Sequence, residues 1–348
     1  MKQYIFGNIN NIRIIKKIGY GYFGTVYLVK DDKNHRYALK IEQVSPDFLV
    51  KSLRSFVWRE NEFSKKMNKL YPNHFLKLHA HLIDNDCEHN QLTENNIDLN
   101  HKSNDPKFDK LRKHLSTLKS CSVKLWSIID LTLHDILKKW KTFKIKTFNN
   151  IMIQLVYVIH LMNKHGYSHN DLHVGNIGLT KTNNKFINIS GTKIKTYGYY
   201  VCVIDYGLIL HKKYNLTSDE KNTIKYSNDL LYVILLIANI YFKNFKKTFP
   251  NIDITKDAKI SKKYLIEINK YLPNEVQTKK AFKIKNFLLN VIYKVVYYDV
   301  YCKQIFKNDL SKIKKVQLRL DIMDINDFLF IVKNCYDVDK VLNHLLDK

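Results

Sequence analysis

Three side chains in the middle of the chain have types and spacing suited to one kind of chemistry. Asp171 and Asn176 lie five positions apart in a loop-like run, and Asp205 follows an apolar strand pattern at residues 200–204. One carboxylate that accepts a hydroxyl proton, together with two oxygen ligands for a metal, is what phosphoryl transfer from a Mg²⁺-bound nucleotide requires. The plainer interpretation is that an Asp and an Asn in one loop are turn formers. The surrounding elements must decide between these two interpretations.

A glycine-rich segment near the N-terminus could cover phosphate groups. Two short apolar runs, residues 12–18 and 25–30, are predicted to be strands, and G-Y-G-Y-F-G joins them. Glycines let the backbone approach phosphate oxygens closely and adopt positive φ. The pattern alone is a weak indication, because a glycine-rich hairpin without a ligand fits it equally well. The β-prone residues after Gly24 argue against a dinucleotide-binding turn, which needs a helix at that point.

A lysine and a glutamate that could orient phosphates follow this segment. Residues 36–44 are predicted to form a strand, on which Ala38 and Lys40 share one face. A small residue beside a Lys fits an adenine site with an ammonium directed at phosphates, although a solvated Lys is the plainer interpretation. Phe56–Leu70 is predicted to be a helix that carries Glu60 on its apolar face. A carboxylate placed there needs a partner, and Lys40 is the natural one; the alternatives are an exposed Glu60 or a role for Glu62.

The charge of the chain is strongly positive, at +26. Such a charge is typical of proteins that bind nucleic acid or acidic surfaces. Only six of the 58 basic residues are Arg, however, and Lys, Asn, Ile and Tyr are abundant, which is typical of AT-rich coding genomes such as those of many large DNA viruses or protists. Because base contacts and bidentate phosphate contacts favour Arg, the Lys excess does not support direct nucleic-acid binding.

The sequence predicts a soluble, intracellular protein. Its five cysteines show no C-x-x-C pair and no zinc spacing, which favours free thiols in a reducing compartment. The N-terminus has no apolar segment typical of a signal peptide, and the longest apolar run, residues 230–242, is too short to cross a bilayer. We expect the cytoplasm or nucleus, or the host cytoplasm or virion for a viral protein.

The pattern of predicted elements divides the chain near residue 130. Strand patterns dominate residues 1–129 and helix patterns dominate residues 130–348. Residues 84–120 are polar and rich in Asn, His, Asp and Lys, which indicates an insertion or a long surface loop. Residues 180–199 form a second polar excursion between Asn176 and the strand that precedes Asp205.

Taken in chain order, these pieces resemble the eukaryotic-type protein kinase superfamily over residues 11–242. The glycine-rich loop G-x-G-x-x-G-x-V matches residues 18–26, V-A-I-K matches A-L-K at 38–40, and Glu60 fits the helix-C position. H-R-D-x-x-x-x-N matches residues 169–176, and D-F-G matches D-Y-G at 205–207. These motifs together are far more specific than any one of them alone. The resemblance implies one α+β, bilobal kinase domain, with a small antiparallel-sheet N-lobe bearing one helix and a larger, mostly helical C-lobe.

The resemblance also implies a role for each matched residue, with ATP and Mg²⁺ as cofactors. Lys40, oriented by Glu60, would hold the α- and β-phosphates, and Asp171 would accept the proton of the attacking hydroxyl. Asn176 and Asp205 would hold Mg²⁺, and residues 129–132 would form the hinge that binds adenine. The implied nucleotide-binding residues are Ile18, Gly19, Tyr20, Gly21, Tyr22, Phe23, Gly24, Thr25, Val26, Ala38, Lys40, Asp130 and Thr132.

Departures from the pattern indicate a divergent branch. Asn170 replaces the Arg of H-R-D, so the usual contact to a phosphorylated activation loop is missing, and His173 replaces the Lys of most Ser/Thr kinases. No A-P-E follows, and only 24 positions separate Asp205 from Asp229, which opens an apolar helix. The chain is most similar to haspin-type kinases, which share D-L-H-x-G-N and I-D-Y, and its I-I-D-L segment resembles the hinge of casein kinase 1 and vaccinia-related kinases. We expect a protein kinase, Ser/Thr-directed, that acts on a protein substrate without activation-loop phosphorylation.

Two other functions fit part of the pattern. Small-molecule kinases of the aminoglycoside/choline type also use H-x-D-L-H-x-G-N and lack A-P-E, but they usually lack the full glycine-rich pattern that this chain has. A pseudokinase, which would serve as a binding scaffold, is disfavoured because Lys40, Asp171, Asn176 and Asp205 are all present.

Overall fold

The computed structural model describes residues 2–9, 11–20, 24–45, 52–85, 119–138, 145–214, 216–218, 220–221, 229–248, 272, 288, 291 and 325–347. The chain forms two compact units, Met1–Asp130 with Ile204–Ile209, and Leu131–Val203 with Leu210–Lys348. The fold is mixed α and β. Most of the predicted insertion, the helix pattern inside it and residues 21–23 of the glycine-rich loop lie outside the described residues.

The first unit contains a six-stranded antiparallel sheet and one long helix, α1 (Phe56–Leu70). The strand order is β1-β5-β6-β4-β3-β2. The strands are β1 (Lys2–Phe6), β2 (Arg13–Tyr20), β3 (Gly24–Lys30), β4 (Arg36–Gln43), β5 (Leu78–Asp84) and β6 (Cys121–Ser127). Helix α1 has the predicted bounds, and its buried residues include Val57, Phe63 and Met67. The sheet and the helix agree with the α+β class that the sequence predicts.

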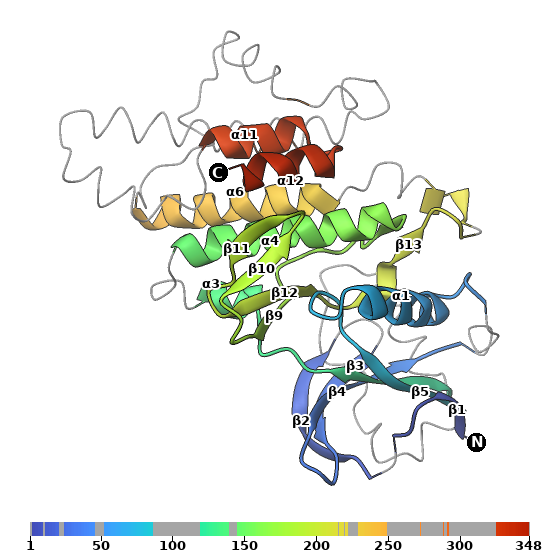
Figure 1. The fold of residues 1–348 in the computed structure, drawn as a ribbon. Coiled ribbons are helices and arrows are strands. Elements are labelled where there is room, and N and C mark those ends of the chain that lie inside the picture. The colour runs from blue at the N-terminus through green and yellow to red at the C-terminus, as the bar shows by residue number, and fades with distance from the viewer. Residues whose placement is uncertain are drawn as a thin grey trace, which may run out of the picture. The chain divides into compact units, whose positions relative to one another are not determined.

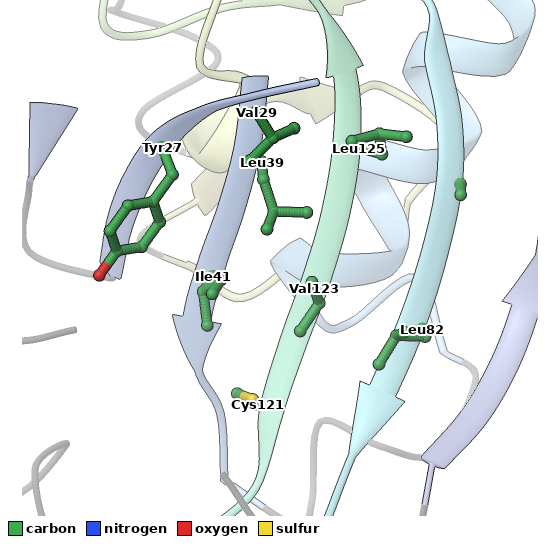
Figure 2. Close-up of a cluster of buried hydrophobic side chains, with 9 residues drawn as sticks. Tyr27, Val29, Leu39, Ile41, Leu82, Cys121, Val123 and Leu125 are labelled. Atoms are coloured by element: carbon green, nitrogen blue, oxygen red, sulfur yellow. The ribbon is translucent and has the colours of Figure 1, made fainter. Parts of the chain in front are cut away.

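The pleat of the sheet separates an apolar face from a face that carries two lysines, Lys40 and Lys124. Apolar side chains of the four central strands gather into one buried cluster, shown in Figure 2: Tyr27, Val29, Leu39, Ile41, Ala80, Leu82, Cys121, Val123 and Leu125. Successive side chains of a strand point to opposite faces. Lys40 therefore lies on the face opposite Leu39 and Ile41, and Lys124 lies opposite Val123 and Leu125. The same alternation that builds the core places both lysines on the other face.

The described residues of the second unit are mostly helical (Figure 1). Its long helices are α4 (Ile145–Lys164) and α6 (Asp229–Thr248), which contact each other, and α12 (Val338–Leu346) and α11 (Ile325–Lys333) contact α4 and α6 respectively. The short helix α3 (Leu133–Lys138) follows strand β7 (Leu131–Thr132). Helix α4 buries an apolar stripe that includes Ile151, Leu155 and Ile159.

Small sheets in the second unit hold the segments around the predicted loop. Strands β12 (Tyr199–Val203), β9 (Ile177–Lys181) and β7 form an antiparallel sheet in that order. Strand β8 (Tyr167–Ser168) pairs with β13 (Leu210–His211). The polar excursion between β9 and β12 contains a hairpin, β10 (Phe186–Ile189) and β11 (Thr192–Lys195), which the sequence did not predict. The buried Gln154 of α4 donates to the Tyr199 carbonyl and accepts from Val201 N–H, which fixes β12 on the helix.

The structure bears on the predictions about membrane-spanning segments and about cysteines. Among the helices of the described segments, none combines the length and the apolar character needed to cross a bilayer. Cys202 and Cys335 are buried free thiols, whereas Cys121 takes part in a disulfide bond. The prediction that all five cysteines are free is therefore wrong for Cys121.

His81 is a buried neutral histidine on the charged face of the sheet. Its Nδ1 lies 2.6 Å from Asn61 Nδ2 and its Nε2 lies 2.9 Å from Ser122 Oγ. Because the amide NH₂ of Asn61 donates, Nδ1 accepts and the ring proton sits on Nε2. Burial, and then the positive charges of Lys124 and Lys65, lower the pKa of His81 to about 2.

This histidine is expected to make the protein sensitive to acid. Below the unfolded pKa of about 6.5 the unfolded chain binds a proton that the folded chain does not, so the free energy of unfolding falls by about 1.4 kcal/mol per pH unit. His81→Gln removes this contribution, and its loss of stability between about pH 6.5 and 4.5 is expected to be smaller by about 2 to 3 kcal/mol. Urea unfolding followed by tryptophan fluorescence measures the difference, with the exposed His134→Gln as control. Equal pH slopes for His81→Gln and the wild type would refute it.

Candidate active site

Lys40 is the centre of the charged group in the first unit. Its Nζ lies 2.9 Å from Asp205 Oδ1, 2.7 Å from Glu42 Oε1 and 3.3 Å from Glu60 Oε1. These carboxylates come from the segment 204–209, from β4 itself and from α1. The structure therefore brings together three residues that the sequence singled out, Lys40, Glu60 and Asp205, and adds Glu42, which sequence reasoning missed.

The surroundings keep Lys40 charged. Burial disfavours its ammonium form, but the carboxylates of Asp205, Glu42 and Glu60 outweigh burial and hold the pKa of Lys40 well above its usual range. The side chain is 14% exposed. An ammonium that keeps its charge can also attract a further anion, such as a phosphate oxygen.

Lys124 is a second buried lysine in this group. It lies directly across the β4–β6 ladder from Lys40, and its Nζ is 2.9 Å from Glu42 Oε2 and also hydrogen-bonded to Glu60 Oε2. Lys124, Glu42 and Glu60 are completely buried. Nothing in the sequence distinguishes Lys124 from the other lysines except its place in an apolar strand pattern. A lysine within an apolar strand pattern is the signal that could have identified Lys124.

The two glutamates of this group differ in their affinity for a proton. Burial raises the pKa of each carboxyl. For Glu42, the ammonium groups of Lys124 and Lys40 outweigh burial and lower the pKa. For Glu60, the neighbouring Glu42 carboxylate adds to the effect of burial, and the pKa is raised despite Lys124 and Lys40. Glu42 is thus the more firmly ionised of the two.

Asp205 has a left-handed backbone conformation, and the next residue, Tyr206, anchors its segment. Asp205 adopts φ 61° and ψ 78°, and the 3₁₀ turn Tyr206–Leu208 follows it. The buried Tyr206 ring lies 4.7 Å from that of Phe63 and 5.6 Å from that of Trp126, centroid to centroid. Its hydroxyl accepts a hydrogen bond of 3.0 Å from Leu76 N–H. These contacts anchor the segment to α1 and the sheet, within the first unit.

The glycine-rich loop is described only at its two ends. Strands β2 and β3 pair as predicted, and Gly19 lies opposite Val26. A Cβ on Gly24 would lie 1.8 Å from the Ile41 carbonyl oxygen, so this glycine is required by the close approach of β3 to β4. Val26, Ala38 and Lys40 share one face of the sheet, since Val26 is directly opposite Lys40 and side chains alternate along each strand. Ile18 is exposed, and Thr25 is buried.

Asp171 and Asn176 are joined by hydrogen bonds in the second unit. Asn176 Nδ2 donates to the Asp171 carbonyl at 2.9 Å and to its Oδ2 at 3.0 Å. Backbone bonds from His173 N–H to the Asp171 carbonyl and from Asn176 N–H to the His173 carbonyl close the loop. Because the amide NH₂ faces Asp171, the amide oxygen is the atom that Asn176 can offer to a metal. His173 Nε2 lies 3.8 Å from Asp171 Oδ2.

Asp229, the first residue of α6, holds this loop in place. Its buried carboxylate accepts hydrogen bonds of 2.9 Å from the backbone N–H groups of His169 and Asn170. Burial raises its pKa, although His169 and these two N–H groups favour the ionised form. The two N–H groups that this carboxylate binds thus belong to the loop and not to α6. Tyr232, one helical turn further on, donates to the Asn170 carbonyl at 2.8 Å.

Asn170 supports the loop through hydrogen bonds to its close neighbour Ser168. It adopts a positive φ of 67°, which Asn tolerates better than most residues. Its side chain accepts from Ser168 Oγ at 2.8 Å and donates to the Ser168 carbonyl at 3.0 Å. The residue that replaces the Arg of H-R-D is thus used within the loop itself.

Thr132, one of the predicted adenine-binding residues, caps a helix. Its backbone N–H and its hydroxyl both donate to Asp135 Oδ2, at 2.9 and 2.8 Å, and its Oγ1 accepts from Asp135 N–H at 3.2 Å. These reciprocal hydrogen bonds cap the N-terminus of α3. Asp130 is exposed at the end of the first unit. A role of either residue in adenine binding stays a prediction.

No protein-family model and no curated protein sequence matches the chain. Function must therefore be inferred from the two groups of residues, each within its own unit. Among the described residues, no three His, Cys, Asp or Glu side chains are grouped to hold a metal by themselves. The predicted metal ligands Asn176 and Asp205 lie in different units, and their binding of Mg²⁺ stays a prediction.

Proposed function

We propose that the chain is a protein kinase that transfers the γ-phosphate of MgATP to a protein hydroxyl, with Ser/Thr as the acceptor. The observation that carries the proposal is the contact of one ammonium, Lys40, with both Glu60 and Asp205. These residues lie 20 and 165 positions away in the sequence. The spacing pattern that resembles kinases requires this grouping, and the geometry agrees with it.

The fold supports the same proposal. A small antiparallel sheet with one helix corresponds to a kinase N-lobe, and the mostly helical second unit corresponds to a C-lobe. We assign the division near residue 130 to the boundary between these lobes. The segment Ile204–Ile209, which belongs to the first unit, then carries the D-Y-G motif.

Each residue has a defined part in the proposed reaction. Lys40 binds the α- and β-phosphates, and Glu60 and Glu42 orient its ammonium. Asp205 and the amide oxygen of Asn176 would each contribute a ligand to Mg²⁺, and this ion would supply positive charge that neutralises the phosphates. Asp171 accepts the proton of the attacking hydroxyl, a role that depends on position more than on a raised pKa because the transition state is loose.

Transfer of labelled phosphate from MgATP tests the proposal. The purified chain is incubated with a mixed protein panel and, separately, with aminoglycosides and amino alcohols. Labelled protein is the expected result. Labelled small molecules without labelled protein would instead identify a small-molecule kinase. Nucleotide binding without any transfer would identify a scaffold.

Activity is expected to be independent of phosphorylation between Asp205 and Asp229. Asn170 has no positive charge to bind a phosphate, and the loop is already held by the buried Asp229. A sample treated with phosphatase, with loss of phosphate verified by mass spectrometry, should keep its transfer rate to within about twofold, less than the effect of one ordinary hydrogen bond. A treated sample without activity would contradict this expectation.

A further inference from the structure

Four buried charges form a closed ring in the first unit. Lys40 contacts Glu42 and Glu60, and Lys124 contacts the other oxygen of each. The order around the ring is therefore lysine, glutamate, lysine, glutamate, with two carboxylates bridging two ammonium groups. Three of the four side chains are at most 1% exposed, and Lys40 is 14% exposed. Asp205 lies outside the ring and contacts it through Lys40.

Strand register explains why the ring has this composition. Lys40 and Lys124 are directly opposite each other in the β4–β6 ladder, and like charges in such positions repel. Burial makes the repulsion more costly, because an unpaired buried charge is strongly destabilising. Glu42 on β4 and Glu60 on α1 each place one oxygen on each ammonium, which removes the repulsion. Lys124 is therefore tolerated only together with two carboxylates.

Lys124 in turn determines how strongly the carboxylates attract Lys40. With Lys124 present, the ring has no net charge, and the third carboxylate near Lys40 is Asp205. Without Lys124, Glu42 and Glu60 would share one ammonium, which would draw Lys40 away from Asp205. The buried group would also carry one more negative charge, which would repel an anionic ligand.

We propose that Lys124 and Glu42 are positioning residues that keep the Lys40 ammonium directed at Asp205 and at the phosphates of a nucleotide. This inference rests on the proposed function as a kinase. It assigns to Glu60 two partners on two strands, β4 and β6, so that α1 is fixed from inside the first unit. Lys40 is then held in its binding position whether or not a ligand is present.

Three variants of the full-length chain test the ring: Lys124→Met, Glu42→Gln and the double variant. Each single variant leaves the buried group with one unbalanced charge, whereas the double variant removes one charge of each sign. The free energy of unfolding is measured in urea, and the affinity for MgATP and the values of kcat and KM are measured beside it. Lys33→Met, an exposed lysine in the turn between β3 and β4, is the matched control.

Lys124→Met is expected to raise the KM for MgATP by at least about tenfold, the scale of one hydrogen bond to a charged group. The double variant is expected to recover most of this loss and to be more stable than either single variant, because its buried group is again balanced. A purely structural role would make the double variant bind no better than Lys124→Met. That result, in a folded double variant, would overturn the proposal.

The unfolding data separate this inference from the proposed function. Strictly additive losses of stability for the two single variants would show that the ring does not exist in solution. A wild-type chain that binds no nucleotide would refute both the kinase assignment and the positioning role. In that case non-additive stability would still establish the ring, so the two failures are distinguishable.

Discussion

Asp171→Asn is expected to abolish phosphoryl transfer while it leaves nucleotide binding intact. The substitution keeps the size of the side chain and the carbonyl that accepts from Asn176 and His173. It removes the group that we propose accepts a proton from the attacking hydroxyl, and such a group contributes about a hundredfold to ten-thousandfold in rate. We therefore expect kcat to fall by at least about a hundredfold, with the affinity for MgATP changed by less than about threefold.

The control for this variant is Asp32→Asn, an exposed carboxylate in the turn between β3 and β4. Single-turnover measurements at saturating MgATP separate the chemical step from product release. Retained turnover in Asp171→Asn would sink the assigned mechanism. A parallel loss of nucleotide affinity would show instead that Asp171 acts through the structure of its loop.

Asp229→Asn is expected to damage both the stability and the activity of the protein. The carboxylate accepts from two backbone N–H groups of the loop and is buried. An asparagine can accept from one of these groups, but its NH₂ would face the other, which then stays unsatisfied. A hydrogen bond to a charged group is worth about 1.5 to 3 kcal/mol, and the free energy of unfolding should fall by about this amount.

The activity of Asp229→Asn should fall further than its stability alone explains. Asp171 directly follows the two anchored residues, and a displacement of about 1 Å in a reacting group can cost about a hundredfold in rate. The transfer rate is measured at a temperature where circular dichroism shows the variant fully folded. Wild-type activity in that folded variant would show that Asp229 does not position the loop. Asp32→Asn again serves as the matched control.

The sequence predicted the parts of the site that depend on local pattern. Strand alternation placed Lys40 beside Ala38, and helix periodicity placed Glu60 on the buried face of α1. The continuous apolar strand before Asp205 predicted a fixed carboxylate at its end. Each of these inferences needed only the geometry of one element, which is why a single sequence sufficed for them.

Residues whose role depends on pairing between distant strands could not be predicted in this way. Lys124 has its partners 82 and 64 positions away, in Glu42 and Glu60, and it is one lysine among many. The contact of Asp229 with the loop spans about 60 positions. Hairpin β10–β11 was missed because each of its strands has only four residues and both lie within a polar segment, which is typical of a loop.

The pleat of β4 has a consequence for how this strand tolerates change. Leu39 and Ile41 face the apolar cluster, while Lys40 and Glu42 face the ring of charges. Neighbouring positions of this strand therefore have opposite requirements. Leu39 and Ile41 must be apolar side chains of the right volume, whereas Lys40 and Glu42 must each carry a charge of a particular sign. A substitution at Leu39 that loosens the core also moves the backbone from which Lys40 extends. The packing of the core and the placement of the buried charges thus depend on the same eight-residue strand.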